Sequence, residues 1–193
     1  MNYYLDIKIV ADEEVPVYFI RNKICAKLHK ALNTLKSSNI GVSFPNYRVK
    51  LGDVVRLHSS QERLVALQAL NWLGGLSGYC VVSDILAVPE LIEGYRVVSR
   101  IRTTMNLKKL EERITYQKAQ GELKTDEDVK NYERQYKQKM FGSSLDNPYL
   151  ELQSSSTTQV YRRFIQFGDL SSTITLGKFD EFGLSKSASI PWF

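Results

Sequence analysis

One amphipathic stretch, residues 17–36, limits the folds open to this chain more than any other part of the sequence. Its apolar side chains recur at steps of three and four residues, which predicts a helix with one face on a core. These apolar positions are Ile24, Cys25, Leu28, Ala31, Leu32 and Leu35. His29 lies on the shoulder of the stripe, roughly 90° from its middle. An imidazole at that position can lean on the core while its nitrogen atoms face a cleft.

The segments around this helix predict the sheet that it covers. Aromatic and β-branched residues indicate strands at 2–10, 39–49, 53–57 and 79–88. A second helix is predicted at 59–73, where a serine can cap the first turn and apolar spacing follows. The order β-α-β-β-α-β is the ferredoxin-like arrangement. We therefore predict an α+β fold, with a ferredoxin-like domain at 1–92 and a second domain at 93–193.

The second domain is predicted to combine strands with two charged helices. The strands are expected at 95–103, 149–156, 159–168 and 172–179, and the helices at 106–121 and 125–140. In the first of these strands, Arg96, Arg100 and Arg102 occupy even positions. A strand alternates its side chains, so the three guanidinium groups are expected on one face.

The charge distribution suggests where a partner binds. The formal net charge is +5, and residues 100–140 hold eleven basic and seven acidic side chains. This local excess indicates a polyanion-binding face, and a solvated helix of mixed charge is the alternative. The sequence contains no run of about 18 apolar residues, so no membrane span is expected. Near the N-terminus there are acidic residues where a signal peptide would need an apolar run. A cytoplasmic protein without membrane contact is expected.

Two histidines and two cysteines are the candidates for proton transfer and nucleophilic chemistry. Histidine exchanges protons near neutral pH, and His29 is the first candidate, with a half-buried polar residue as the alternative. His58 falls in a predicted strand and is expected to support the core. Cys25 and Cys80 lack zinc-site spacing. Cys25 precedes His29 by four residues, so a Cys–His nucleophile pair is one interpretation and a small core residue is the other.

A hydroxyl-rich turn is the remaining candidate for binding. Residues 154–158 are serine and threonine, whose side chains can donate to phosphate and sugar oxygens. Tyr161, beside Arg162 and Arg163, offers a ring for base stacking next to cations. An ordinary hairpin tip explains the same residues without any ligand.

Several motifs, taken in order, resemble one family. GVSFP follows a first helix that carries KLH, and VSR precedes a basic helix. An SxST turn then precedes a Q-x-aromatic-R strand, and the chain ends in FGLSKSASIPWF. Together these motifs resemble the type I-F CRISPR endoribonuclease that processes repeat RNA, over the whole length of the chain.

The resemblance implies an activity and partners. It implies that the ferredoxin-like domain carries the catalytic helix and that 93–193 grips a CRISPR repeat stem-loop. It also implies metal-independent cleavage at the 3′ base of that hairpin, retention of the mature guide RNA, and no cofactor. Subunits of a type I-F surveillance complex are the implied protein partners.

The resemblance also assigns catalytic and neighbouring roles. His29 matches the family's catalytic histidine, and Ser154 matches the serine that holds the attacking 2′-hydroxyl. Ser156 and Thr157 match its close helpers. Tyr161 falls where an aromatic residue stacks on the closing base pair of the hairpin.

The assignment of RNA contacts includes departures from the family pattern. Arg100 matches a base-reading arginine, whereas Arg102 replaces a glutamine and can read a base or a phosphate. Phe182 stands where a tyrosine can occur, so stacking is retained and a phenolic hydroxyl is lost. In the groove helix the basic candidates are Lys109, Arg113 and Lys118. Several arginines of the family's ladder are replaced there by Glu111, Glu112, Tyr116 and Gln117.

The implied chemistry leaves two alternatives. RNA supplies its own 2′-hydroxyl nucleophile, so the products are expected to be a 2′,3′-cyclic phosphate and a 5′-hydroxyl. One alternative is a non-catalytic subunit that holds the hairpin within a CRISPR ribonucleoprotein and does not need His29. The other is a Cys–His hydrolase built on Cys25.

Overall fold

The computed structural model describes residues 1–10, 13–102, 105, 107–142, 147–154 and 159–193. By their contacts these residues form two compact units. The first unit comprises Met1–Arg100 together with Pro148–Phe193, and the second comprises Ile101–Asn147. The boundary predicted between residues 92 and 93 separates a ferredoxin-like domain from an RNA-binding one, and it stays a prediction.

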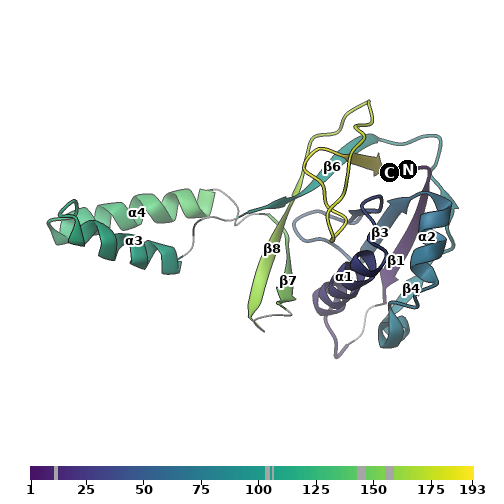
Figure 1. Cartoon of the computed structure of the whole chain (residues 1–193), viewed down its shortest axis with the longest axis horizontal. Helices are drawn as coiled ribbons and strands as arrows, with labels where there is room; N and C mark the ends of the chain where they lie inside the picture. The colour runs from purple at the N-terminus through teal and green to yellow at the C-terminus, as the bar shows by residue number, and fades with distance from the viewer. Residues whose placement is uncertain (11–12, 103–104, 106, 143–146, 155–158) are drawn as a thin grey trace. The chain divides into compact units, whose positions relative to one another are not determined.

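The first sheet confirms the α+β class. Its strand order is β2-β3-β1-β4, with β5 also paired to β1, and the pairings are antiparallel. The helix α1 lies across this sheet (Figure 1). The elements are β1 (Tyr3–Ile9), α1 (Val17–Thr34), β2 (Gly41–Ser43), β3 (Val54–Ser59), α2 (Gln61–Gln68), the 3-10 helix η1 (Gly74–Tyr79), β4 (Cys80–Val82) and β5 (Leu86–Ala87).

The buried residues recur every second position in the strand β1 and at the helical spacing of three or four positions in α1. Along β1, Leu5, Ile7 and Ile9 are buried because alternate side chains of a strand point to one face. The apolar stripe of α1 is buried from Ile20 to Leu32 and packs into the same core. The amphipathic pattern therefore identified the main core helix correctly.

Three predicted elements of this part of the chain differ from the observed ones. The strand predicted at 39–49 is limited to the three residues of β2, Gly41–Ser43. The second helix was expected to reach residue 73, but α2 ends at Gln68 and its last turn passes into irregular turns before η1. Ser60 caps α2 as expected, because its side chain accepts from the Arg63 N–H at 3.4 Å. The predicted strand 79–88 is divided into β4 and β5, which pair with opposite ends of β1.

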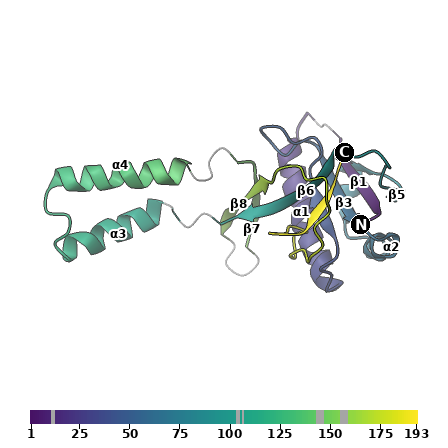
Figure 2. The ribbon, with the colours of Figure 1, turned by 90° about the horizontal axis from the view of Figure 1, so that it is seen from above.

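A second antiparallel sheet has the order β7-β8-β6-β9. Its strands are β6 (Gly94–Ile101), β7 (Tyr149–Gln153), β8 (Val160–Phe167) and β9 (Ser189–Trp192). Figure 2 shows β9 beside β6, in the register Gly94 opposite Trp192. Pro191 lacks an N–H group, so its place on the edge strand β9 costs the sheet no ladder bond.

The strand predicted at 172–179 is wrong, and β9 takes its place in the sheet. Backbone groups of this segment bond to the serines near β9: the Thr175 N–H donates to the Ser189 Oγ at 2.8 Å, and the Lys178 carbonyl accepts from the Ser185 Oγ at 2.8 Å. Its apolar residue Leu176 is largely exposed, whereas all four residues of β9 are buried. The side chains of 172–179 have the pattern of a strand, but the strand that buries its residues in this sheet is β9.

The second unit consists of α3 (Leu107–Ala119) packed against α4 (Asp126–Gly142). Leu110 and Tyr136 are buried between the helices, among the side chains that the structure describes. Thr125 and Asp128 form a reciprocal cap at the start of α4: the Asp128 N–H donates to Thr125 Oγ1 at 3.1 Å, and the Thr125 N–H donates to Asp128 Oδ2 at 2.9 Å. The Thr125 hydroxyl also donates to Asp128 Oδ2 at 2.8 Å, and this bond together with the one from the Thr125 N–H lowers the pKa of the Asp128 carboxyl group.

None of the described helices is both long enough and apolar enough to pass through a lipid bilayer.

Candidate functional site

His29 lies on α1 with its side chain half-buried. Its Nε2 atom is 3.2 Å from Nδ2 of Asn33, one turn further along the helix. In the neutral tautomer that has its proton on Nδ1, Nε2 accepts this hydrogen bond from the Asn33 amide. In that tautomer Nε2 carries the lone pair that can take a proton.

Phe182 fixes the plane of the His29 ring. The two rings are stacked, with centroids 4.2 Å apart and planes 28° apart. Phe182 belongs to a loop that Asp180 organises, since Oδ1 of Asp180 accepts the N–H groups of Phe182 and Leu184 at 2.8 and 2.9 Å. The position predicted as an RNA-contacting aromatic residue is thus buried and makes its ring contact with His29.

Gly183 lets this loop turn directly over β2. Its φ of 71° is in the left-handed region, and a Cβ atom there would collide with the Val42 side chain. The carbonyl of Gly183 accepts the Val42 N–H at 2.8 Å. The loop that carries Phe182 is therefore attached to the same sheet that α1 covers.

The surroundings of His29 favour its neutral form. Burial is the largest cause that lowers the pKa of the imidazole, and the charges of Arg163 and Lys30 lower it further. The carboxylates of Glu181 and Asp180 act in the opposite direction. The net effect is a pKa below the ordinary value, so the ring is available to accept a proton throughout the neutral range.

Ser154 follows β7 directly and is half-buried. Its N–H donates to the Gln159 carbonyl at 2.9 Å, which closes the hairpin between β7 and β8. Because α1 packs against β7, the strand that leads to Ser154 lies alongside the helix that carries His29. The predicted helpers Ser156 and Thr157 lie outside the described residues, as do Ser155 and Thr158.

Neighbouring residues of β8 face opposite sides, which corrects one expectation. Tyr161 pairs with Leu152 and is half-buried against the core. Arg162 is exposed, 3.4 Å from Glu151 and over the Tyr149 ring. Arg163 is only 7% exposed, so it is no surface cation beside Tyr161. Strand alternation explains this difference between adjacent arginines, and the sequence reasoning overlooked it.

The predicted arginine face of β6 is interrupted. The Arg96 guanidinium lies over the Trp192 ring at 4.5 Å, and Val98 on the same face is buried. Arg100 is exposed near the end of β6, and Arg102 is exposed just after it. Arg96 is packed on Trp192, whereas Arg100 and Arg102 are exposed. The face is therefore not a continuous row of exposed arginines.

The basic residues of α3 occupy different sides of the helix. Lys109, Arg113 and Lys118 are all exposed. Lys109 and Arg113 are one turn apart and share a side, and the Arg113 guanidinium lies 5.7 Å from the Tyr136 ring centroid. Lys118 lies roughly 140° around the helix from Arg113, at about 100° per residue. A single surface could contact the first two together more readily than all three.

His58 is a core residue, as expected from its strand. It is 0% exposed, and its Nε2 atom is 2.8 Å from the Ser43 hydroxyl on the neighbouring strand β2. Burial, with smaller contributions from Arg56 and the N-terminal amine, lowers its pKa to about 3. The imidazole is therefore neutral and inaccessible, which leaves His29 as the histidine able to reach a substrate.

Cys25 is unsuited to be a nucleophile, and its replacement should spare catalysis. It is 4% exposed, and burial raises the pKa of its thiol to about 12. We expect Cys25→Ala to retain the wild-type cleavage rate and to lose about 1 kcal/mol of stability from the core contact. Single-turnover cleavage and urea unfolding measure the two effects. A loss of activity in a folded Cys25→Ala protein would restore the Cys–His hydrolase.

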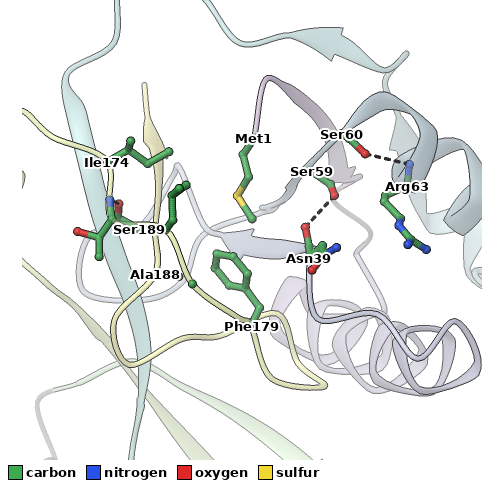
Figure 3. A pocket seen from close by; sticks show the side chains of 12 residues that line it. Met1, Asn39, Ser59, Ser60, Arg63, Ile174, Phe179, Ala188 and Ser189 are labelled. Atoms are coloured by element: carbon green, nitrogen blue, oxygen red, sulfur yellow. Dashed lines mark hydrogen bonds between the residues drawn. The ribbon is translucent and has the colours of Figure 1, made fainter.

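Two other features of the described residues bear on ligands. No three His, Cys, Asp or Glu side chains among them gather as a metal-binding group. A pocket of about 240 Å³ lies between the 59–63 and 174–179 segments (Figure 3). Two of its polar groups are already bonded, because the Ser59 hydroxyl donates to the Asn39 carbonyl and Ser60 caps α2. Its lining does not include His29, Phe182 or Ser154.

Comparison with known proteins defines the class. A family model described as CRISPR-associated protein (Cas_Csy4) matches residues 4–193. The CRISPR-associated endonuclease Cas6/Csy4 of Escherichia coli (strain UTI89 / UPEC) is 37% identical over 193 residues, all of both chains. The protein of the same name from Pseudomonas aeruginosa (strain UCBPP-PA14) is 34% identical over 196 residues, again all of both chains. The chain belongs to the Cas6/Csy4 family, which confirms the resemblance found in its motifs.

Proposed function

We propose that this protein is an endoribonuclease that cleaves CRISPR precursor RNA at the 3′ base of the repeat stem-loop and retains the mature guide RNA. Membership of a family whose named relatives are CRISPR-associated endonucleases supports the substrate class. The observation that carries the proposal is the state of His29. Its imidazole is half-buried, stacked on Phe182 and within hydrogen-bond distance of Asn33 through Nε2.

The proposed reaction needs no group besides the RNA and the protein. Neutral His29 takes the proton of the 2′-hydroxyl, and the 2′-oxygen then forms a bond to the adjacent phosphorus. The bond from phosphorus to the 5′-oxygen breaks, and the protonated His29 gives its proton to that leaving oxygen. The products are a 2′,3′-cyclic phosphate and a 5′-hydroxyl.

Ser154 is proposed to hold the sugar so that the 2′-hydroxyl attacks in line with the leaving oxygen. Positioning of this kind can contribute as much to the rate as the proton transfer itself. The packing of β7 against α1 supports a common site for Ser154 and His29. Ser156 and Thr157 are proposed to help from the same turn.

The proposed RNA contacts all come from residues 93–193. Arg100 and Arg102 would read bases or phosphates, and Lys109, Arg113 and Lys118 would contact the groove of the hairpin stem. Tyr161 would stack on the closing base pair, and Phe182 would act through the His29 ring. The exposure of the five cations supports contacts with phosphate.

The domain assignment is part of the proposal. The order β2-β3-β1-β4, with two helices in β-α-β-β-α-β sequence, supports a ferredoxin-like domain at 1–92 that carries the catalytic helix. Residues 93–193 would form the RNA hairpin-binding domain. Subunits of a type I-F surveillance complex are proposed as partners that share the retained guide RNA.

The test uses labelled repeat hairpin RNA, excess protein and a metal chelator. We expect one cut at the 3′ base of the stem, a cyclic phosphate on the 5′ product, and a product that stays bound. A matched RNA with a single 2′-deoxy sugar at the cut site should bind normally and remain intact, because the nucleophile is absent. Cleavage of the deoxy RNA, or a requirement for metal, would contradict the mechanism. Tight binding without any cut would indicate the hairpin-holding subunit instead.

A further inference from the structure

Arg163 is a buried cation next to the proposed catalytic group. It lies on β8 and is 7% exposed. Its Nη1 atom is 3.4 Å from Oδ2 of Asp180, and its Nε atom is buried without a hydrogen-bond partner among the described residues. Its guanidinium carbon is 3.6 Å from the centroid of the Phe182 ring.

The Phe182 ring lies between Arg163 and His29. His29 stacks on this ring with centroids 4.2 Å apart, and Arg163 lies over the same ring at 3.6 Å. One face of a phenyl ring cannot hold both groups at these distances, so each occupies its own face. Arg163 is thus the support behind Phe182, and Phe182 is the support behind His29.

A purely structural role is a poor explanation for this arginine. Burying a guanidinium costs several kcal/mol unless its donors are satisfied, and a well-packed apolar residue in the same volume is often at least as stable. Here Nη1 is 3.4 Å from Oδ2 of Asp180, which is long for an ion pair, and Nε has no hydrogen-bond partner in the part of the chain that the structure describes. An apolar side chain would support Phe182 without this cost, so the charge itself is the feature to explain.

We propose that Arg163 is a positioning residue for His29: it holds the Phe182 ring against the imidazole that takes the proton. This inference rests on the proposed function, in which His29 accepts a proton from RNA.

The charges around His29 agree with this role. Beyond the effect of burial, Arg163 and Lys30 oppose a charged imidazole, whereas Glu181 and Asp180 favour it. Lys30 and Glu181 are exposed, so salt and water screen them more strongly than the buried Arg163. Removal of the Arg163 charge should therefore raise the pKa of His29, and removal of the Glu181 charge should lower it.

Three variants separate charge from packing. Arg163→Met keeps an unbranched side chain and loses the charge, Arg163→Lys keeps the charge and loses the planar group, and Glu181→Gln is the exposed control of opposite sign. The His29 imidazole is titrated by NMR in the protein without RNA. The pH dependence of single-turnover hairpin cleavage is then measured for each protein.

We expect Arg163→Met to raise the pH at which the His29 signal titrates and to move the acidic limb of cleavage to higher pH. At a pH on that limb, cleavage should fall by about tenfold for each unit that the limb moves. Arg163→Lys should leave the limb in place and lower the rate at every pH, because the ring is held less firmly. Glu181→Gln should move the limb to lower pH.

The outcomes distinguish this inference from the proposed function. A folded Arg163→Met protein with unchanged His29 titration and an unchanged pH profile would overturn the role of Arg163 alone. If Arg163→Met does not fold, an acidic limb that moves upward in Arg163→Lys, which keeps the charge, would overturn it as well. Full activity of His29→Ala would overturn the proposed function, and the RNA-free titration would still decide whether Arg163 acts on the imidazole.

Discussion

Single-turnover cleavage of the repeat hairpin should fall by about 10²- to 10⁴-fold when His29 is replaced by alanine. This range is the usual contribution of a positioned acid or base to a rate. His29 is half-buried and pairs with Asn33 and Phe182, so its removal takes away proton transfer without opening the main core. Affinity for the hairpin should stay close to that of the wild type, because the proposed RNA-binding cations are unchanged.

Two variants make this result specific to proton transfer. His29→Gln keeps a planar group that can stack on Phe182 and cannot cycle protons, so it should be nearly as slow as His29→Ala. Lys23→Ala, on the exposed side of the same helix, should cleave like the wild type. Gel-shift binding with uncleavable deoxy RNA provides the affinity of each variant. Normal cleavage by His29→Gln would show that the imidazole only packs against Phe182.

The second large effect concerns stability below neutral pH and comes from His58. Its pKa is about 3 in the folded protein and about 6.5 in an unfolded chain. Between these values only the unfolded state binds the proton, so acid favours unfolding. The contribution of neutral His58 is complete above about pH 6.5 and is lost at about 1.4 kcal/mol per pH unit as the pH falls towards 3.

His58→Gln isolates this contribution, because glutamine does not titrate and can still bond to the Ser43 hydroxyl. We expect the variant to be less stable than the wild type at pH 7 by about 1–3 kcal/mol, as is usual for a core substitution. The difference should shrink as the pH falls and change sign between about pH 4 and 6. Urea unfolding of both proteins at pH 7, 6, 5 and 4 measures it. A constant difference across this range would mean that His58 can be protonated in the folded state.

Local sequence patterns determined much of the architecture. The stripe from Ile24 to Leu35 predicted the core helix because a helix repeats every 3.6 residues, and aromatic and β-branched content predicted β1. The order of elements gave the α+β class, and the motifs led to the family. The placement of His58 in a strand also predicted its burial.

Tertiary contacts decided what local patterns could not. The segment 172–179 alternates like a strand, yet β9 forms the sheet edge because it alone buries all four of its residues. Alternation along β8 puts Arg162 and Arg163 on opposite faces, and only tertiary packing decides which of the two faces is buried. The stack of Arg163, Phe182 and His29 joins residues from three distant segments. Sequence identified the histidine, whereas the folded chain set its protonation, because burial and nearby charges depend on contacts that no local pattern contains.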